Sequence, residues 1–277
     1  MPDQSDVPFH TSLVGDPRAP HRVAFLHGLF GRGRNFSRIA AGLKPEAQSL
    51  LVDEPNHGQS GWTEHFDYLQ MADLVAAELR RSFAVAGPVD IVGHSMGGKV
   101  AMVLALRHPD LVRRLCIVDI SPMTSPSARG EFEHLLTALR GLPLTEITSR
   151  SDADERLRGS IPEDMVRGFL LQNLARQDGG FGWEPNLQLL HSELATVMGF
   201  PDMTGSRFEG RVLWVRGERS DYVRDSDAPE MRALFPRTTL MTIRGAGHWV
   251  HAERPAEMIA ALRTFLLNDR AESVKRG

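Results

Sequence analysis

A serine between two glycines is the first candidate for chemistry in this sequence. Ser95 lies in the stretch VDIVGHSMGGKVAM, where Val89–Val92 predict a buried strand and Lys99–Leu106 predict a helix. The glycines between them indicate a sharp turn, which projects a serine hydroxyl at the carboxyl edge of a sheet. The Met96 amide, at the start of the helix, would stabilise an oxyanion formed beside Ser95. The pattern therefore predicts that Ser95 is a nucleophile.

The same turn also has the glycine and lysine spacing of a phosphate-binding loop. Gly93 is followed by four residues and then by glycine and Lys99. The next residue is Val100, whereas such a loop needs a Ser or Thr hydroxyl to bind Mg²⁺. His94 and Met96 are also bulky where backbone amides would have to surround a phosphate. The sequence therefore favours a nucleophile over a nucleotide site.

A serine hydroxyl is a weak nucleophile without a base, and the chain has 11 histidines. His248 lies in TIRGAGHWVHAERP, after the last predicted strand and before the last predicted helix. A loop at the carboxyl edge of the sheet shares that edge with Ser95, so we predict that His248 is the base. The alternative is a histidine on a surface loop. His251 is expected to pack or to bond the loop backbone.

The stretch VAFLHGLFG provides a candidate for a second oxyanion donor. It ends the first predicted strand with His27 and Gly28, so the following amide, that of Leu29, would face the serine turn. The side chain of His27 is expected to bond the loop rather than to take part in chemistry. We therefore predict an oxyanion hole made of the Leu29 and Met96 amides.

The elements that must position these residues alternate along the chain. Six apolar runs predict strands, at Val23–His27, Ser49–Asp53, Val89–Val92, Leu115–Asp119, Val212–Arg216 and Thr239–Ile243. Tyr68–Phe83 and Pro255–Leu267 predict helices with one apolar face. From Ser121 to Gly210 helical patterns replace strands, as in Met165–Leu174 and Leu187–Val197. The sequence therefore predicts an α/β fold, a mostly parallel sheet with helices on both faces and a helical insertion.

Composition limits the possible functions. The chain has 277 residues, 42% of them hydrophobic and 24% charged, and a net charge of -3, which disfavours a nucleic-acid or anionic-membrane surface. The single cysteine, Cys116, excludes an internal disulfide and lies in an apolar run that predicts a buried side chain. The N-terminal MPDQSDVPFH lacks the apolar core of a secretory signal, and there is no long apolar run. A cytoplasmic protein is expected.

Five motifs, LHGLFG, DEPNHGQS, GHSMGG, VDISP and GAGHWVHAERP, resemble those of the alpha/beta-hydrolase superfamily in their order across nearly the whole chain. The sequence is most similar to the YbfF-like subgroup of small bacterial esterases and acyl-CoA thioesterases. The resemblance implies a hydrolase core over residues 1–121 and 209–277 and a helical cap over 122–208. It also implies that Asp53 and His57 form a structural loop that shapes a pocket wall. Phe169, Phe181 and Trp183 lie in the cap, where helix packing is the expected role of each and lining an acyl site is the alternative.

The acid is where the sequence departs from the superfamily's commonest pattern. That acid lies three residues after the glycine that ends the penultimate strand, a position held here by Ser220, with Asp221 one residue later. The subgroup resemblance implies Asp119, in VDISP, as the acid, and Ser220 as a further hydrogen-bonding group. Asp221 is the alternative acid, and a turn-capping role is the alternative for Asp119.

Together these features predict a serine hydrolase that cleaves carboxylic esters or thioesters through an acyl-enzyme on Ser95. The expected partner is a small-molecule acyl substrate, without nucleic acid or membrane, and no metal or cofactor is expected. Two alternatives stay open, because a fold does not fix a substrate. One is a carbon–carbon bond hydrolase or lyase, and the other is an inactive hydrolase-fold binding protein. The sequence does not indicate an oligomeric state.

Overall fold

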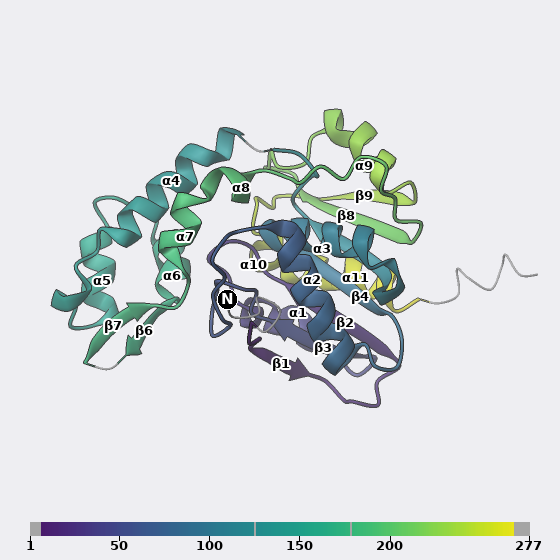
Figure 1. Ribbon diagram of the computed structural model, residues 1–277, viewed down its shortest axis with the longest axis horizontal. Helices are drawn as coiled ribbons and strands as arrows, with labels where there is room; N and C mark the ends of the chain where they lie inside the picture. The colour runs from purple at the N-terminus through teal and green to yellow at the C-terminus, as the bar shows by residue number, and fades with distance from the viewer. Residues whose placement is uncertain (1–6, 125, 178, 269–277) are drawn as a thin grey trace, which may run out of the picture.

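The computed structural model describes residues 7–124, 126–177 and 179–268, so most of the N-terminal stretch predicted not to be a secretory signal lies outside the described residues. The core is a seven-stranded sheet with the order β1-β3-β2-β4-β5-β8-β9 (Figure 1). Its strands are β1 (Thr11–Val14), β2 (His21–Leu26), β3 (Ala47–Val52), β4 (Val89–His94), β5 (Val112–Val118), β8 (Arg211–Gly217) and β9 (Thr238–Ile243). This confirms the predicted α/β fold and its six predicted strands.

Only β1 runs antiparallel to its neighbour, β3, and every other neighbouring pair of this sheet is parallel. The edge strand β1 was not predicted from the sequence. Because the other strands are parallel, their carboxyl ends lie at one edge of the sheet, where the strand-to-loop junctions after β2, β4, β5, β8 and β9 meet. The sequence motifs with candidate chemistry all follow one of these strands.

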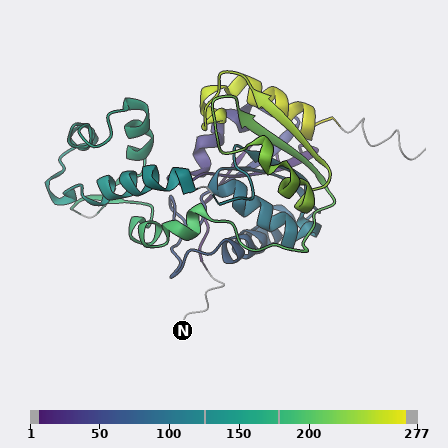
Figure 2. The ribbon, with the colours of Figure 1, turned by 90° about the horizontal axis from the view of Figure 1, so that it is seen from above.

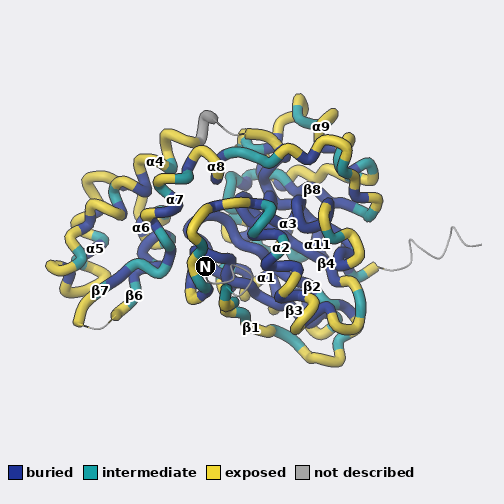
Figure 3. The backbone as a smooth tube through the Cα atoms, in the orientation of Figure 1, coloured by how far each residue is buried: buried dark blue, intermediate teal, exposed yellow. Residues whose placement is uncertain are grey.

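Helices cover both faces of the sheet (Figure 2). The helices α2 (Tyr68–Glu78) and α3 (Met96–Arg107) pack together over one apolar core, and α1 (Ser37–Gly42) and α11 (Pro255–Leu266) pack together over the other. A π-helical turn, Leu79–Phe83, extends α2 to the predicted length. The smaller helices α9 (Ala228–Leu234) and α10 (Val250–Glu253) flank β9 in the sequence. Figure 3 shows that the buried backbone is concentrated in the sheet and in α3.

The elements between β5 and β8 project to one side of the sheet, and we call them the cap (Figure 1). They are α4 (Pro126–Arg140), α5 (Arg150–Leu157), α6 (Asp164–Leu171), β6 (Leu174–Gln177), β7 (Gly180–Trp183), α7 (Leu187–Ser192) and α8 (Leu194–Met198). The hairpin of β6 and β7 was not predicted. The predicted helix Leu187–Val197 is two helices, because the backbone leaves helical geometry at Glu193 (φ −101°, ψ 17°). The exact cap boundaries stay a prediction.

Candidate active site

The turn at Ser95 has the strained geometry that its glycines indicate. Ser95 has φ 52° and ψ −119°, between the end of β4 and the first residue of α3. Positive φ is uncommon for a residue with a side chain, and here it directs the hydroxyl away from the sheet. A Cβ at Gly93 would collide with the Gly97 carbonyl, and one at Gly97 would collide with the His27 carbonyl. The two glycines therefore allow strand and helix to approach closely enough for the turn.

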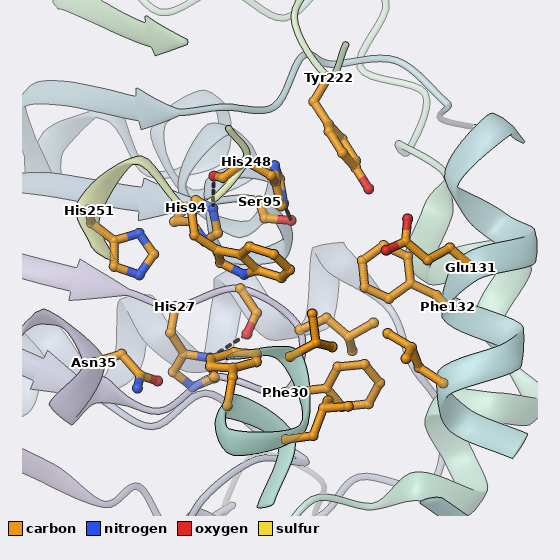
Figure 4. Close-up of a pocket in the computed structure, with 18 residues that line it drawn as sticks. His27, Phe30, Asn35, His94, Ser95, Glu131, Phe132, Tyr222, His248 and His251 are labelled. Atoms are coloured by element: carbon orange, nitrogen blue, oxygen red, sulfur yellow. Dashed lines mark hydrogen bonds between the residues drawn. The ribbon is translucent and has the colours of Figure 1, made fainter. Parts of the chain in front are cut away.

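His248 faces Ser95 in the pocket (Figure 4) and bonds a carboxylate, that of Asp119, on the other side of its ring. The Ser95 Oγ is 3.1 Å from His248 Nε2, and His248 Nδ1 is 2.8 Å from Asp119 Oδ2. A carboxylate oxygen accepts, so Nδ1 carries the proton and Nε2 is free to accept from the serine hydroxyl. This tautomer suits a general base, since the unprotonated nitrogen faces Ser95.

Asp119 is fully buried and follows β5 with φ 53°. Its Oδ1 accepts from the Gly217 amide at 2.9 Å, and its Oδ2 accepts from both His248 and the Ser220 hydroxyl. The structure thus brings Ser95, Asp119, His248 and Ser220 together. Asp221 is exposed, and its carbonyl oxygen accepts from Arg224. Ser220 contacts Asp119 and Asp221 does not, because the loop after β8 turns Ser220 toward the sheet and leaves Asp221 at the surface.

The amides of Leu29 and Met96 are the predicted oxyanion donors. Both residues lie beside Ser95 in the walls of the neighbouring cavities, and Met96 is the first residue of α3. Within residues 7–124, 126–177 and 179–268, neither amide donates a hydrogen bond to another protein group. The Gly97 amide donates to the His27 carbonyl at 3.0 Å, which joins the end of β2 to the serine turn. Two unused donors therefore flank the candidate nucleophile.

The His27 side chain organises the loop, as predicted. Its Nδ1 donates to the Gly28 carbonyl at 2.8 Å, and its Nε2 accepts from the Glu54 amide at 3.0 Å. Burial lowers the pKa of His27, so the neutral ring keeps one nitrogen as donor and the other as acceptor. Both ring nitrogens of His27 are therefore hydrogen-bonded to backbone groups.

Two aromatic residues beside His248 were not singled out as site residues from the sequence. His94 Nε2 donates to the His248 carbonyl at 2.9 Å, and burial holds the pKa of His94 well below its usual range. Tyr222 stacks on the His248 ring with centroids 4.0 Å apart and planes 24° apart. Their positions in the sequence could have marked them as site residues, because His94 precedes the candidate nucleophile and Tyr222 lies two residues after Ser220. Together they fix the backbone and ring of His248.

A cavity of about 110 Å³ opens beside Ser95 between core and cap. Figure 4 shows Glu131 and Phe132 reaching toward it from the cap, opposite the core residues. Most of the lining is apolar, and it includes Leu29, Phe30, Leu135, Phe169 and Leu170. The site therefore joins an apolar chamber to a small number of polar groups, as ligand pockets do.

The residues that line this cavity test the roles predicted for Asp53, His57, Phe169 and Trp183. Asp53 and His57 do not line it, so their prediction as wall residues was wrong. Asp53 instead accepts from the Gly33 and Gln59 amides, at 2.8 and 3.0 Å, and fixes two loops. Phe169 lines the cavity. Trp183 packs in the cap, where its indole N–H donates to the Leu139 carbonyl at 3.1 Å.

The remaining cysteine and histidine candidates have structural roles. Among the described residues, no group of three His, Cys, Asp or Glu side chains is placed to hold a metal ion, and no helix has the length and apolarity to cross a bilayer. Cys116 is fully buried, and burial raises the pKa of its thiol. His251 packs against Phe36 and His94, with ring centroids 4.7 and 4.6 Å away. Both side chains behave as the sequence predicted.

A mostly parallel sheet with a serine on a strained strand-to-helix turn, and a histidine at the same edge, defines the class of alpha/beta hydrolases. The chain belongs to the alpha/beta hydrolase family, whose model matches residues 23–261. This confirms the superfamily resemblance of the five sequence motifs.

Similar proteins cover most of the chain. The sn-1-specific diacylglycerol lipase ABHD11 of Danio rerio is 37% identical over 88% of this chain and 78% of its own length. Esterase YbfF of Escherichia coli strain K12 is 30% identical over 88% of this chain and 92% of its own length. A solved structure described as a marine microorganism esterase superposes with a TM-score of 0.88, at 32% identity, over 94% of this chain and all of that one. The predicted similarity to YbfF-like esterases is thereby confirmed.

Proposed function

We propose that this protein is a serine hydrolase that cleaves carboxylic esters or thioesters through an acyl-enzyme on Ser95. The observation that carries the proposal is the continuous contact from Asp119 through His248 to Ser95, with distances of 2.8 and 3.1 Å. A serine hydroxyl, a histidine that can take its proton and an acid that orients the histidine are the groups that acyl transfer requires. Family membership supports the same reading.

In the acylation step, Ser95 Oγ attacks the carbonyl carbon of the ester while His248 Nε2 takes the hydroxyl proton. The carbonyl oxygen becomes an oxyanion, which accepts hydrogen bonds from the Leu29 and Met96 amides. Asp119 holds the Nδ1 proton of His248 and stabilises the imidazolium. His248 then gives its proton to the leaving alcohol or thiol, and the bond to the acyl group breaks.

Deacylation repeats these steps with water as the nucleophile. His248 Nε2 takes a proton from the water as its oxygen attacks the acyl carbon, and the same two amides hold the second oxyanion. The proton returns to Ser95 Oγ when the acyl bond breaks, which releases the carboxylic acid. None of these steps calls on a metal or cofactor.

The experiment that tests the proposal is the purified Ser95→Ala variant, assayed with p-nitrophenyl butyrate and butyryl-CoA and labelled with a fluorophosphonate. Loss of the nucleophile is expected to lower turnover roughly a thousandfold or more and to abolish labelling, with the thermal midpoint nearly unchanged. Ser121→Ala is a matched control, because Ser121 is also a buried serine that follows a strand of the sheet.

The alternatives give other results. If Ser95→Ala keeps a tenth of the wild-type activity, Ser95 has no part in the mechanism. A folded wild type that is not labelled would favour a binding protein. A carbon–carbon bond hydrolase would turn over esters weakly and cleave a vinylogous diketone rapidly.

Substrate size follows from the cavity beside Ser95. The chamber has mostly apolar walls and a volume of about 110 Å³, which accommodates a short or medium acyl chain. We therefore expect kcat/KM to be highest for short to medium chains in a series of p-nitrophenyl esters from acetate to palmitate. A maximum at palmitate would contradict this expectation.

A further inference from the structure

The loop that carries the Leu29 amide contains a strained residue. Phe30 has φ 61°, and it is one of four non-glycine residues with positive φ among those described. A bulky residue in this region is sterically unfavourable and persists only where its surroundings hold it. Within the loop the Gly31 amide donates to the Gly28 carbonyl at 2.8 Å, which closes a tight turn around Leu29. The direction of the Leu29 amide therefore depends on what holds the turn.

One contact that holds this turn in place comes from the cap. Asn173 lies between α6 and β6, and its Nδ2 donates to the Phe30 carbonyl at 2.7 Å and to the Leu170 carbonyl at 3.2 Å. The side chain is 2% exposed, so water does not compete for these bonds. The Phe30 carbonyl belongs to the same turn as the Leu29 amide. Asn173 thus connects the cap directly to this turn.

Asn173 is itself fixed in place. Its backbone amide donates to the Leu170 carbonyl at 3.1 Å, and its carbonyl accepts from the Glu184 amide at 3.0 Å. The guanidinium of Arg32 donates to Asn173 Oδ1 from Nε at 3.3 Å and forms an ion pair with Glu184. The amide oxygen of Asn173 therefore faces Arg32, and this assigns its NH₂ group to Phe30.

We infer that Asn173 is a positioning residue for the oxyanion hole, so that a residue of the cap sets the geometry of a catalytic amide in the core. This inference rests on the proposed ester hydrolysis. Its physical basis is that an oxyanion donor is effective only when it is aimed at the position of the oxyanion. If the Phe30 carbonyl is released, the turn can relax from positive φ and move the Leu29 amide.

The test uses Asn173→Asp, which keeps the size of the side chain and its contact with Arg32. It replaces the NH₂ donor by an oxygen that repels the Phe30 carbonyl. Asn173→Ala removes the side chain altogether. Trp62→Phe is the matched control, because the Trp62 indole also joins core to cap, by donating to the Glu184 carbonyl at 3.2 Å, without contacting the turn. All four proteins are compared by thermal midpoint before any assay.

The readouts separate positioning from a structural role. For Asn173→Asp we expect kcat for p-nitrophenyl butyrate to fall about tenfold to a hundredfold with KM little changed, since a misplaced catalytic group costs rate rather than binding. Affinity for a trifluoromethyl ketone, whose adduct carries an oxyanion, should fall by a similar factor. Hydrogen exchange of the amides at residues 28–31 should rise. Trp62→Phe should change none of these.

Three outcomes decide the matter. Equal kinetics and inhibitor affinity in Asn173→Asp and Trp62→Phe, with an active wild type, would overturn the inference alone. A rise in KM with unchanged kcat would also overturn it, because it would indicate a binding role for the cap. A wild type that neither hydrolyses the ester nor binds the ketone would overturn both the inference and the proposed function. If Asn173→Ala does not fold, the isosteric Asn173→Asp still decides.

Discussion

The edge of the sheet and the junction between core and cap both pack against apolar side chains, and the junction adds hydrogen bonds from side chains to backbone carbonyls. At the sheet edge, residues such as Asp119 follow strands that are buried on both faces by two apolar cores. At the junction, polar side chains of the core donate to backbone carbonyls of the cap. Tyr68 donates to Val197 at 2.7 Å, and Lys99 donates to Met198 and Gly199 at 2.9 and 2.6 Å.

Apolar burial and hydrogen bonds have different roles here: burial fixes the ends of the strands, and the hydrogen bonds hold single points of the cap. Apolar burial is spread over many side chains, so no single contact decides where the strand ends lie. A hydrogen bond is directional and involves two groups, so its loss frees one point of the cap without loosening the sheet. The candidate catalytic groups on the core should therefore tolerate changes at the junction, except where a junction residue contacts the turn that carries one of them, as Asn173 does.

The largest expected effect lies at the sheet edge and concerns the acid. Asp119→Asn should leave the fold intact and reverse the preferred tautomer of His248, because the new NH₂ group can donate to Nδ1. We expect turnover to fall by about four orders of magnitude, as that change does in a serine protease triad, which corresponds to about 5 kcal/mol of activation free energy. Turnover is measured at saturating ester, with folding checked by circular dichroism.

Asp221→Asn is the matched control, because this side chain is exposed and is one residue from Ser220. Asp221→Asn should lower turnover far less than Asp119→Asn does. Near-normal activity in Asp119→Asn together with a collapse in Asp221→Asn would return the acid to the superfamily's common region of the chain.

A smaller effect is expected at the junction. Lys99 is 2% exposed, burial lowers its pKa to about 7, and its ammonium group faces the last carbonyls of α8. Lys99→Met keeps the aliphatic length and leaves these carbonyls without a donor, which costs about 1–3 kcal/mol for a buried polar group. We expect hydrogen exchange to rise at residues 194–199 and to stay unchanged in β4 and β5.

The exposed Lys44 provides the control, since Lys44→Met changes the same residue type at the surface of the core. Unchanged exchange in the cap of Lys99→Met, or an equal rise throughout the sheet, would mean that the junction and the sheet are not held separately.

Features that local sequence pattern determines could be predicted, and features that depend on contacts between distant residues could not. The parallel strands are continuous apolar runs, and the turn at Ser95 is marked by glycines, so local pattern was sufficient for both. The strand β1 has two exposed and two half-buried residues and exists because it pairs with β3. Asp119 could be chosen only by resemblance, since its contact with His248 joins residues 129 positions apart.

The cap was harder to predict for the same reason. The hairpin of β6 and β7 consists of two strands of four residues each, too short for a clear period of two. Asn173 contacts Phe30 across 143 positions, and Arg32 contacts Asn173 across 141. No local pattern marks such pairs, because each residue alone is an ordinary polar side chain on a loop.

An effect of similar size is expected where the sheet edge meets the cavity, and it depends on pH. His251 is buried against Phe36 and His94, and burial lowers its pKa from 6.5 to about 4. Between these values the unfolded chain binds a proton that the folded protein does not, so His251 makes the free energy of unfolding decrease as the pH falls below 6.5. At pH 5 this contribution is roughly 2 kcal/mol.

His251→Phe should remove that contribution while keeping an aromatic ring against Phe36. In urea unfolding at pH 7 and pH 5, we expect the variant to lose roughly 2 kcal/mol less than the wild type on acidification. His65→Gln changes an exposed histidine and should leave the pH dependence as it is in the wild type. If His251→Phe and the wild type lose the same free energy between the two pH values, then His251 is not held neutral by burial. The folded protein would then admit a proton at this point of the sheet edge.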